Sequence, residues 1–166
     1  KGLLLSSISG EKNSKVTVIG CGEVCRSSIH KSIQIGASVT AIDINEDILN
    51  ELKNQYGENI TTLVSGSESA TNAIRSADLV VGAVLLPGRK PPIVITEEDI
   101  NSMEKGSVIV DVAIDQGGCV EGVKPNTHSE PFEIRSGVIV SAIANLPGAV
   151  PRTSSIELST NLQKYV

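Results

Sequence analysis

Residues 15–45 read KVTVIGCGEVCRSSIHKSIQIGASVTAIDIN, and this stretch determines the predicted fold. Residues 15–19 form a short apolar run with β-branched side chains, which is typical of a buried strand. From residue 22 to residue 35 the apolar spacing becomes helical and Gly36 ends the helix, while residues 38–42 return to a strand pattern. The helix side chains expected to face the core are Val24, Ile29, Ile33 and Ile35.

The alternation of strand and helix continues to the end of the chain. Asn45 is placed to cap a helix over residues 46–56, with Ile48, Leu49 and Leu52 on its apolar face. Further strands are expected at residues 59–64, 78–84, 107–112 and 137–142, and further helices at residues 68–76, after Thr96 and from Pro151 onward. This order predicts a doubly wound α/β fold with a parallel sheet, a Rossmann-like dinucleotide-binding domain.

The chain is predicted to form a single dinucleotide-binding domain. Its 166 residues contain no internal repeat, no low-complexity tract and no linker. We expect residues 1–14 to be a lead-in segment and residues 151–166 to be an exit helix.

Composition and charge argue against several function classes. The net charge is −5 without a cluster of Lys and Arg, which speaks against nucleic-acid binding. No apolar run reaches the ~18 residues of a membrane span. Three cysteines, Cys21, Cys25 and Cys119, without a secretory pattern indicate a reducing, cytoplasmic setting. No second Cys/His pair completes a zinc site, so no metal is expected.

The first strand–helix turn carries a candidate nucleotide site. Residues 20–25 (GCGEVC) stand where a G-x-G-x-x-G fingerprint is expected. Gly20 allows the tight turn, and Gly22 lets a pyrophosphate approach the helix N-terminus, where unpaired N–H groups favour an anion. Asp43 ends the second strand, where a carboxylate accepts hydrogen bonds from the ribose hydroxyls and repels a 2′-phosphate. The predicted cofactor is therefore NAD rather than NADP, with Gly20, Gly22, Glu23, Val24 and Asp43 at its site.

Two residues depart from the fingerprint. Cys25 replaces the third glycine, although its side chain is small enough for the helix and strand to pack closely. Glu23 adds like charge beside the expected pyrophosphate, unless its side chain turns to solvent. A doubly wound domain with ordinary turn glycines and no ligand is the alternative interpretation.

Beyond the fingerprint, the chain resembles the family of alanine dehydrogenases and proton-translocating transhydrogenases over essentially its whole length. The DQGGC run is the alanine dehydrogenase version of its motif. The motifs that carry the resemblance are KG (1–2), DIN (43–45), ADLVVGAV (77–84), PG (87–88), GSVIVDVA (106–113), DQGGC (115–119), THS (127–129) and ANLPGAVPRTS (144–154).

The resemblance implies a reaction and roles for further residues. Members interconvert L-alanine with pyruvate and ammonia and move a hydride to or from NAD. By similarity, Asp115 is the catalytic carboxylate of this domain, and Asn145 contacts the nicotinamide end of the cofactor or the substrate. Ser65 would lie near the adenine, and Val84 and Leu85 would line the cofactor cleft. A capping Asp in a tight turn is the alternative for Asp115.

The resemblance also implies missing parts. In the family a separate domain binds the substrate carboxylate and supplies a catalytic His, and neither His30 nor His128 matches that motif. We therefore expect this chain to be inactive alone, to meet L-alanine or pyruvate only through an absent substrate domain, and to belong to a homo-oligomer. A divergent non-catalytic nucleotide-binding module and the cofactor domain of a transhydrogenase-like protein stay open as alternatives.

Overall fold

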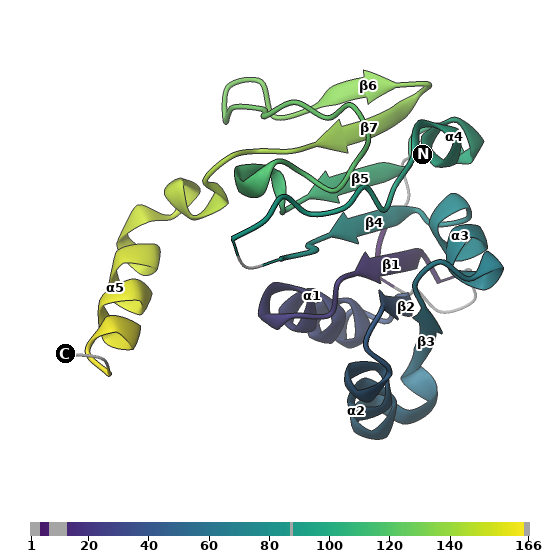
Figure 1. Ribbon diagram of the computed structural model, residues 1–166, viewed down its shortest axis with the longest axis horizontal. Helices are drawn as coiled ribbons and strands as arrows, with labels where there is room; N and C mark the ends of the chain where they lie inside the picture. The colour runs from purple at the N-terminus through teal and green to yellow at the C-terminus, as the bar shows by residue number, and fades with distance from the viewer. Residues whose placement is uncertain (1–3, 7–12, 87, 165–166) are drawn as a thin grey trace.

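A computed structural model describes residues 4–6, 13–86 and 88–164. Most of the predicted lead-in segment, Pro87 and the last two residues of the predicted exit helix lie outside the described residues. The strands form one seven-stranded sheet in the order β3-β2-β1-β4-β5-β7-β6 (Figure 1). Every pair is parallel except β6 with β7, which are antiparallel.

The elements have the following bounds. The strands are β1 (Lys15–Ile19), β2 (Ser38–Asp43), β3 (Ile60–Val64), β4 (Leu79–Gly82), β5 (Val108–Asp111), β6 (Glu133–Arg135) and β7 (Val138–Ser141). The α-helices are α1 (Glu23–Gln34), α2 (Glu46–Tyr56), α3 (Glu68–Arg75), α4 (Glu97–Ser102) and α5 (Pro151–Leu162). Three short 3₁₀ helices are η1 (Gly57–Asn59), η2 (Ile114–Gln116) and η3 (Leu146–Ala149).

This topology confirms the predicted doubly wound fold. The chain builds β1, β2 and β3 outward in one direction, then returns to place β4 on the other side of β1. The order of the strands therefore reverses between β1 and β4. In open α/β sheets, ligands bind outside the carboxyl ends of the strands at such a reversal. The short antiparallel edge strand β6 was not predicted.

The apolar core lies in two layers, one on each face of the sheet. Figure 1 shows α1 and α2 on one side and α3 and α4 on the other. The α1/α2 layer includes Ile29 and Leu52, and the α3/α4 layer includes Ile74 and Ile100. Because both faces are covered, the inner strands are apolar on both sides, as is usual for a parallel sheet.

Helix α1 corrects part of the predicted core. Its buried positions are Cys25, Ile29 and Ser32, which are spaced four and three residues apart along one helix face. Val24 precedes that face and is 54% exposed, and Ile35 lies just past the helix end and is 41% exposed. The prediction that these two side chains face the core is therefore wrong.

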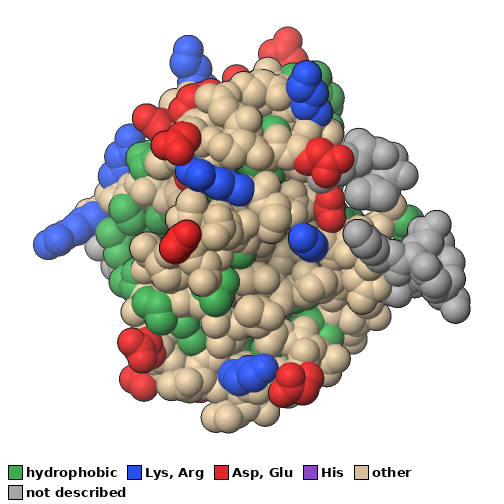
Figure 2. Space-filling model, turned by 90° about the vertical axis from the view of Figure 1, so that its right-hand side faces the viewer, with side chains coloured by type: hydrophobic (Ala, Val, Ile, Leu, Met, Phe, Trp, Pro, Cys, Tyr) green, Lys and Arg blue, Asp and Glu red, His purple; other side chains and the backbone are tan. Residues whose placement is uncertain are grey.

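Helix α5 lies apart from the sheet (Figure 1). The predicted start at Pro151 is confirmed, since proline is tolerated in a first helical turn. None of its described residues is buried. None of the helices within the described ranges combines the length and the apolar composition that a membrane span requires. The face in Figure 2 carries Lys and Arg interspersed with Asp and Glu.

Candidate functional site

A cavity of about 580 Å³ opens where the strand order reverses, at the carboxyl ends of β1, β2 and β4. This volume lies within the range of small-molecule sites. The predicted site residues that line it are Gly20, Gly22, Asp43, Ser65, Val84 and Leu85. The lining residues that the sequence analysis did not single out for the site are Ile19, Ile42, Ile44, Asn45, Ile48, Ala83, Leu86, Pro92, Ile93 and Val94.

The fingerprint turn forms one end of this cavity. Gly20 has φ +84°, and a Cβ there would lie 2.9 Å from the Ala83 carbonyl oxygen, so a side chain at this position would collide with backbone. Gly22 is the N-cap of α1 and makes no side-chain capping bond, and a Cβ there would meet nothing within 4 Å. The 12-residue helix α1 therefore begins without a side-chain cap and with free space beside its N-cap, and an uncapped helix N-terminus can bind an anion.

Asp43 ties the end of β2 to this turn. Its Oδ2 accepts the Cys21 N–H at 2.6 Å, and its Oδ1 accepts the Asn45 N–H at 2.9 Å. An ionised carboxylate has about four acceptor sites, so two remain for a ligand. The predicted role of Asp43 at the ribose did not include its hydrogen bond to the fingerprint turn, because no local sequence pattern links these two segments.

Glu23 and Val24 lie on the exposed first turn of α1, outside the residues that line the cavity. Cys25, which follows them, is fully buried, and its Sγ lies 3.7 Å from the Ile19 carbonyl oxygen. The thiol therefore fits between α1 and β1 at the position of the third fingerprint glycine.

Asp115 and Asn145 form a second group beyond β5. Asp115 lies in η2, and both of its carboxylate oxygens accept the Asn145 N–H, at 3.2 and 3.3 Å. Asn145 has a left-handed backbone, with φ 53°, just before η3. Both side chains are exposed and neither lines the large cavity. A smaller cavity of about 310 Å³ is lined by Leu85, Gly88, Arg89 and Gln116, so it shares Leu85 with the large one and reaches the neighbour of Asp115.

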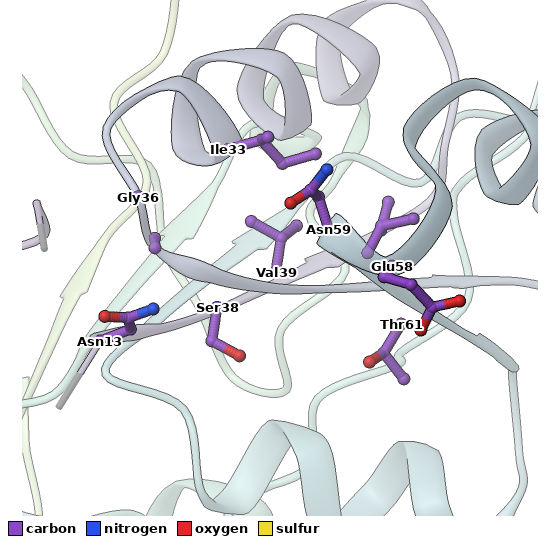
Figure 3. A pocket seen from close by; sticks show the side chains of 10 residues that line it. Asn13, Ile33, Gly36, Ser38, Val39, Glu58, Asn59 and Thr61 are labelled. Carbon is purple, nitrogen blue, oxygen red and sulfur yellow. The ribbon is translucent and has the colours of Figure 1, made fainter.

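A third cavity lies at the opposite edge of the sheet, near the starts of β2 and β3 (Figure 3). Its volume is about 250 Å³, and Ser38, Asn59 and Thr61 are among its lining residues. None of the predicted site residues lines it. Within the described residues, no group of three or more His, Cys, Asp or Glu side chains is arranged to hold a metal ion.

The three cysteines are buried, free thiols. Burial raises the pKa of Cys21, Cys25 and Cys119 to about 12 in each case. The negative charge of Asp43 adds to the rise at Cys21, and that of Asp111 adds to the rise at Cys119. The thiols are therefore protonated at neutral pH and are held as packing groups rather than nucleophiles.

We expect the folded chain to resist thiol labelling at pH 8. A pKa of about 12 lowers the thiolate fraction on the order of a thousandfold relative to a free cysteine, and burial blocks access as well. Labelling with a chromogenic disulfide should count no thiols in buffer and three in denaturant. Rapid labelling of even one thiol in the folded protein would contradict this result.

The chain is similar to known proteins over nearly its whole length. The sequence profile of the family described as "Alanine dehydrogenase/PNT, C-terminal domain" matches residues 1–166. The chain is 48% identical to an alanine dehydrogenase of Bacillus subtilis (strain 168) over 166 residues, covering 99% of this chain and 44% of the relative. It is 46% identical to an alanine dehydrogenase of Geobacillus stearothermophilus, covering 96% of this chain and 43% of the relative.

Solved structures give the same result. An L-alanine dehydrogenase structure superposes with a TM-score of 0.94 at 39% identity, covering 99% of this chain and 46% of that one. A transhydrogenase from Sinorhizobium meliloti superposes with a TM-score of 0.80 at 26% identity, covering 93% and 44%. The chain thus spans less than half the length of these relatives. It belongs to the family of alanine dehydrogenase/PNT C-terminal domains.

Proposed function

We propose that this chain is the NAD-binding domain of an alanine dehydrogenase, which converts L-alanine, NAD and water to pyruvate, ammonia and NADH. One observation carries the cofactor assignment: the Cys21 N–H of the fingerprint turn donates a hydrogen bond to the Asp43 carboxylate at one end of a cavity of about 580 Å³. The uncapped N-terminus of α1 would receive the pyrophosphate. Ser65, Val84 and Leu85 line the same cavity and would contact the rest of the dinucleotide.

Asp43 favours NAD over NADP. Its carboxylate already accepts two backbone N–H groups, which fix its position before any ligand arrives. The remaining acceptor sites would receive the ribose hydroxyls, whereas a 2′-phosphate would bring a second negative charge against the carboxylate.

Asp115 would handle protons in the reaction, and Asn145 would lie beside it. NAD, when bound, supplies the acceptor for the hydride of alanine. Water must then attack the resulting imine carbon, and a carboxylate near that carbon accepts and returns the proton. Support for this role comes from the exposed position of Asp115 in η2, which follows the carboxyl end of β5, and from its hydrogen bond with the Asn145 N–H.

The other partners follow from the resemblance. Substrate binding would fall to a separate domain, and the complete protein would be a cytoplasmic homo-oligomer without nucleic-acid or membrane partners. The first 14 residues would lead into the dinucleotide-binding domain, and α5 would lead out of it toward the substrate domain. The cofactor domain of a transhydrogenase is the second candidate, which the lower identity of 26% to the Sinorhizobium meliloti protein makes weaker.

The isolated chain should bind NADH without oxidising alanine. Positioning of reactants supplies up to ~7–11 kcal/mol of a barrier, and the substrate-binding groups would lie outside this chain. Fluorescence of NADH should report binding, and absorbance at alkaline pH with alanine and NAD should stay flat. A steady production of NADH that disappears in Asp115→Ala would contradict the division of labour proposed here.

The altered fingerprint gives a second test of the cofactor site. Glu23→Val should tighten NAD binding several-fold at low salt and less at high salt, because it removes a repulsion of ~1 kcal/mol between Glu23 and the pyrophosphate that salt screens. Cys25→Gly is the matched control. Cys25 is buried and acts through packing, so its replacement should change the affinity by an amount nearly independent of salt. Titration of both variants and the parent at two ionic strengths makes the comparison.

If Glu23→Val leaves the NAD affinity unchanged at low salt, the exposed Glu23 side chain points away from the bound anion. If neither variant nor the parent binds NAD, the cofactor assignment falls and a non-catalytic module is left.

A further inference from the structure

The loop that carries Asp115 begins and ends at a buried carboxylate. The chain leaves β5 at Asp111, passes through η2 and the glycines 117–118, and comes back beside the end of β5 at Cys119 and Val120. Asp111 has no exposed surface. A carboxylate in that position must be compensated, because burying an unpaired charge is costly.

Hydrogen bonds from both ends of the loop provide the compensation. Asp111 Oδ1 accepts the Ala113 N–H at 2.9 Å, on the outgoing side. Asp111 Oδ2 accepts the Cys119 N–H at 2.8 Å and the Val120 N–H at 3.1 Å, on the returning side. The Cys119 thiol lies 3.5 Å from Oδ1 as a fourth, weaker donor. Both oxygens of Asp111 thus act as acceptors, one for each side of the loop.

The glycine next to Cys119 is required by this arrangement. Gly118 has φ +74°, and a Cβ there would lie 2.9 Å from Asp111 Oδ2 and 2.7 Å from Val123 Cγ1. The returning segment of the loop therefore lies directly against the carboxylate. At the tip of the loop, the Asp115 carboxylate accepts the Asn145 N–H with both of its oxygens.

We propose that Asp111 is a positioning residue, which closes the base of the loop and thereby holds the Asp115 carboxylate against Asn145. The functional meaning rests on the role proposed for Asp115 above, but the structural statement does not. A residue that merely stabilised β5 would leave the Asp115–Asn145 contact intact in any variant that folds. Replacement of a positioning residue would instead break the Asp115–Asn145 contact and leave the sheet intact.

The variant Asp111→Asn separates these two cases. It is nearly isosteric, but its Nδ2 would face a backbone N–H on one side of the loop, so at least one donor loses its acceptor. In ¹H–¹⁵N correlation spectra, the Asn145 amide signal reports its bond to Asp115, and Asp115→Ala gives the position of that signal without the bond. We expect Asp111→Asn to move the Asn145 signal in the same direction by a comparable amount, and to speed its hydrogen exchange at least ~10-fold.

Asp99→Asn is the matched control. Asp99 is also a buried carboxylate with backbone and side-chain donors, since it closes the capping box of α4 and pairs with Arg75 at 2.8 Å. Its replacement should lower stability and leave the Asn145 signal in place. An Asn145 signal at the parent position in folded Asp111→Asn would overturn the proposal.

If Asp111→Asn does not fold, hydrogen exchange of the parent chain decides. The amides of Ala113, Cys119, Val120 and Asn145 should then exchange through one opening, with equal free energies within the error. Exchange of Asn145 at least ~100-fold faster than the other three would show that the tip moves independently of Asp111 and would overturn the proposal. Neither measurement uses NAD, so a failure to bind NADH would count against the proposed function alone.

Discussion

Gly20→Ala is expected to lower the free energy of unfolding by about 3 kcal/mol and to abolish NADH binding in the protein that still folds. An L-residue with a left-handed backbone costs ~1–2 kcal/mol, and overpacking costs ~1–3 kcal/mol more. Both apply here, because Gly20 has φ +84° and a Cβ would lie 2.9 Å from the Ala83 carbonyl oxygen and 3.0 Å from Val84 N. Relief of the collision would push the fingerprint turn away from β4 and into the cavity.

Gly66→Ala is the matched control for this change. Gly66 has φ +83°, almost the same backbone as Gly20, but a Cβ there would meet nothing within 4 Å. Its replacement should cost only the backbone strain of ~1–2 kcal/mol. The difference between the unfolding free energies of the two variants, measured by denaturant titration, therefore gives the energetic cost of the collision. Equal losses of stability would show that close packing against residues 83–84 does not constrain the turn.

Asp43→Asn is expected to weaken NADH binding by about 10- to 100-fold, because hydrogen bonds to a charged group contribute ~1.5–3 kcal/mol each. Two effects act together. The ribose hydroxyls lose a charged acceptor, and the amide Nδ2 would face either the Cys21 N–H or the Asn45 N–H, which now bond to the carboxylate. The affinity for NADPH should fall less, because the repulsion of the 2′-phosphate disappears, so the preference between the two cofactors narrows.

Asp47→Asn provides the comparison for Asp43→Asn. Asp47 is exposed in the first turn of α2 and does not line the cavity. Its replacement by Asn removes the same charge as Asp43→Asn does. Its replacement should change NADH affinity less than about twofold, since an exposed charge at that distance is screened. NADH affinity that is the same in Asp43→Asn and Asp47→Asn would mean that the Asp43 carboxylate does not contact the cofactor.

The sequence predicted those features that depend on local patterns. The β-branched run of residues 15–19, the glycines of the turn and the capping residues Asn45 and Thr96 each act within a few positions, and the structure confirms the elements they predict. Most of the predicted cofactor residues line one cavity, because the strand order brings the carboxyl ends of β1, β2 and β4 together.

The features that were missed depend on contacts between distant segments. Asp43 bonds to the turn 22 positions earlier, and Asp115 bonds to Asn145 30 positions later. Strand β6 has only three residues and is stabilised by pairing with β7 rather than by its own pattern. Val24 shows the opposite error, since an apolar side chain at the start of α1 suggested core packing where the structure leaves it exposed.

Calorimetric titration of the parent chain with NADH and with NADPH tests the central claim most directly. If the Asp43 end of the cavity receives the adenosine ribose, NADH binds one site per chain and NADPH binds at least ~10-fold more weakly, which corresponds to the loss of a charged hydrogen bond. Equal or tighter binding of NADPH, or no binding of NADH at all, would contradict the assignment of this cavity to NAD.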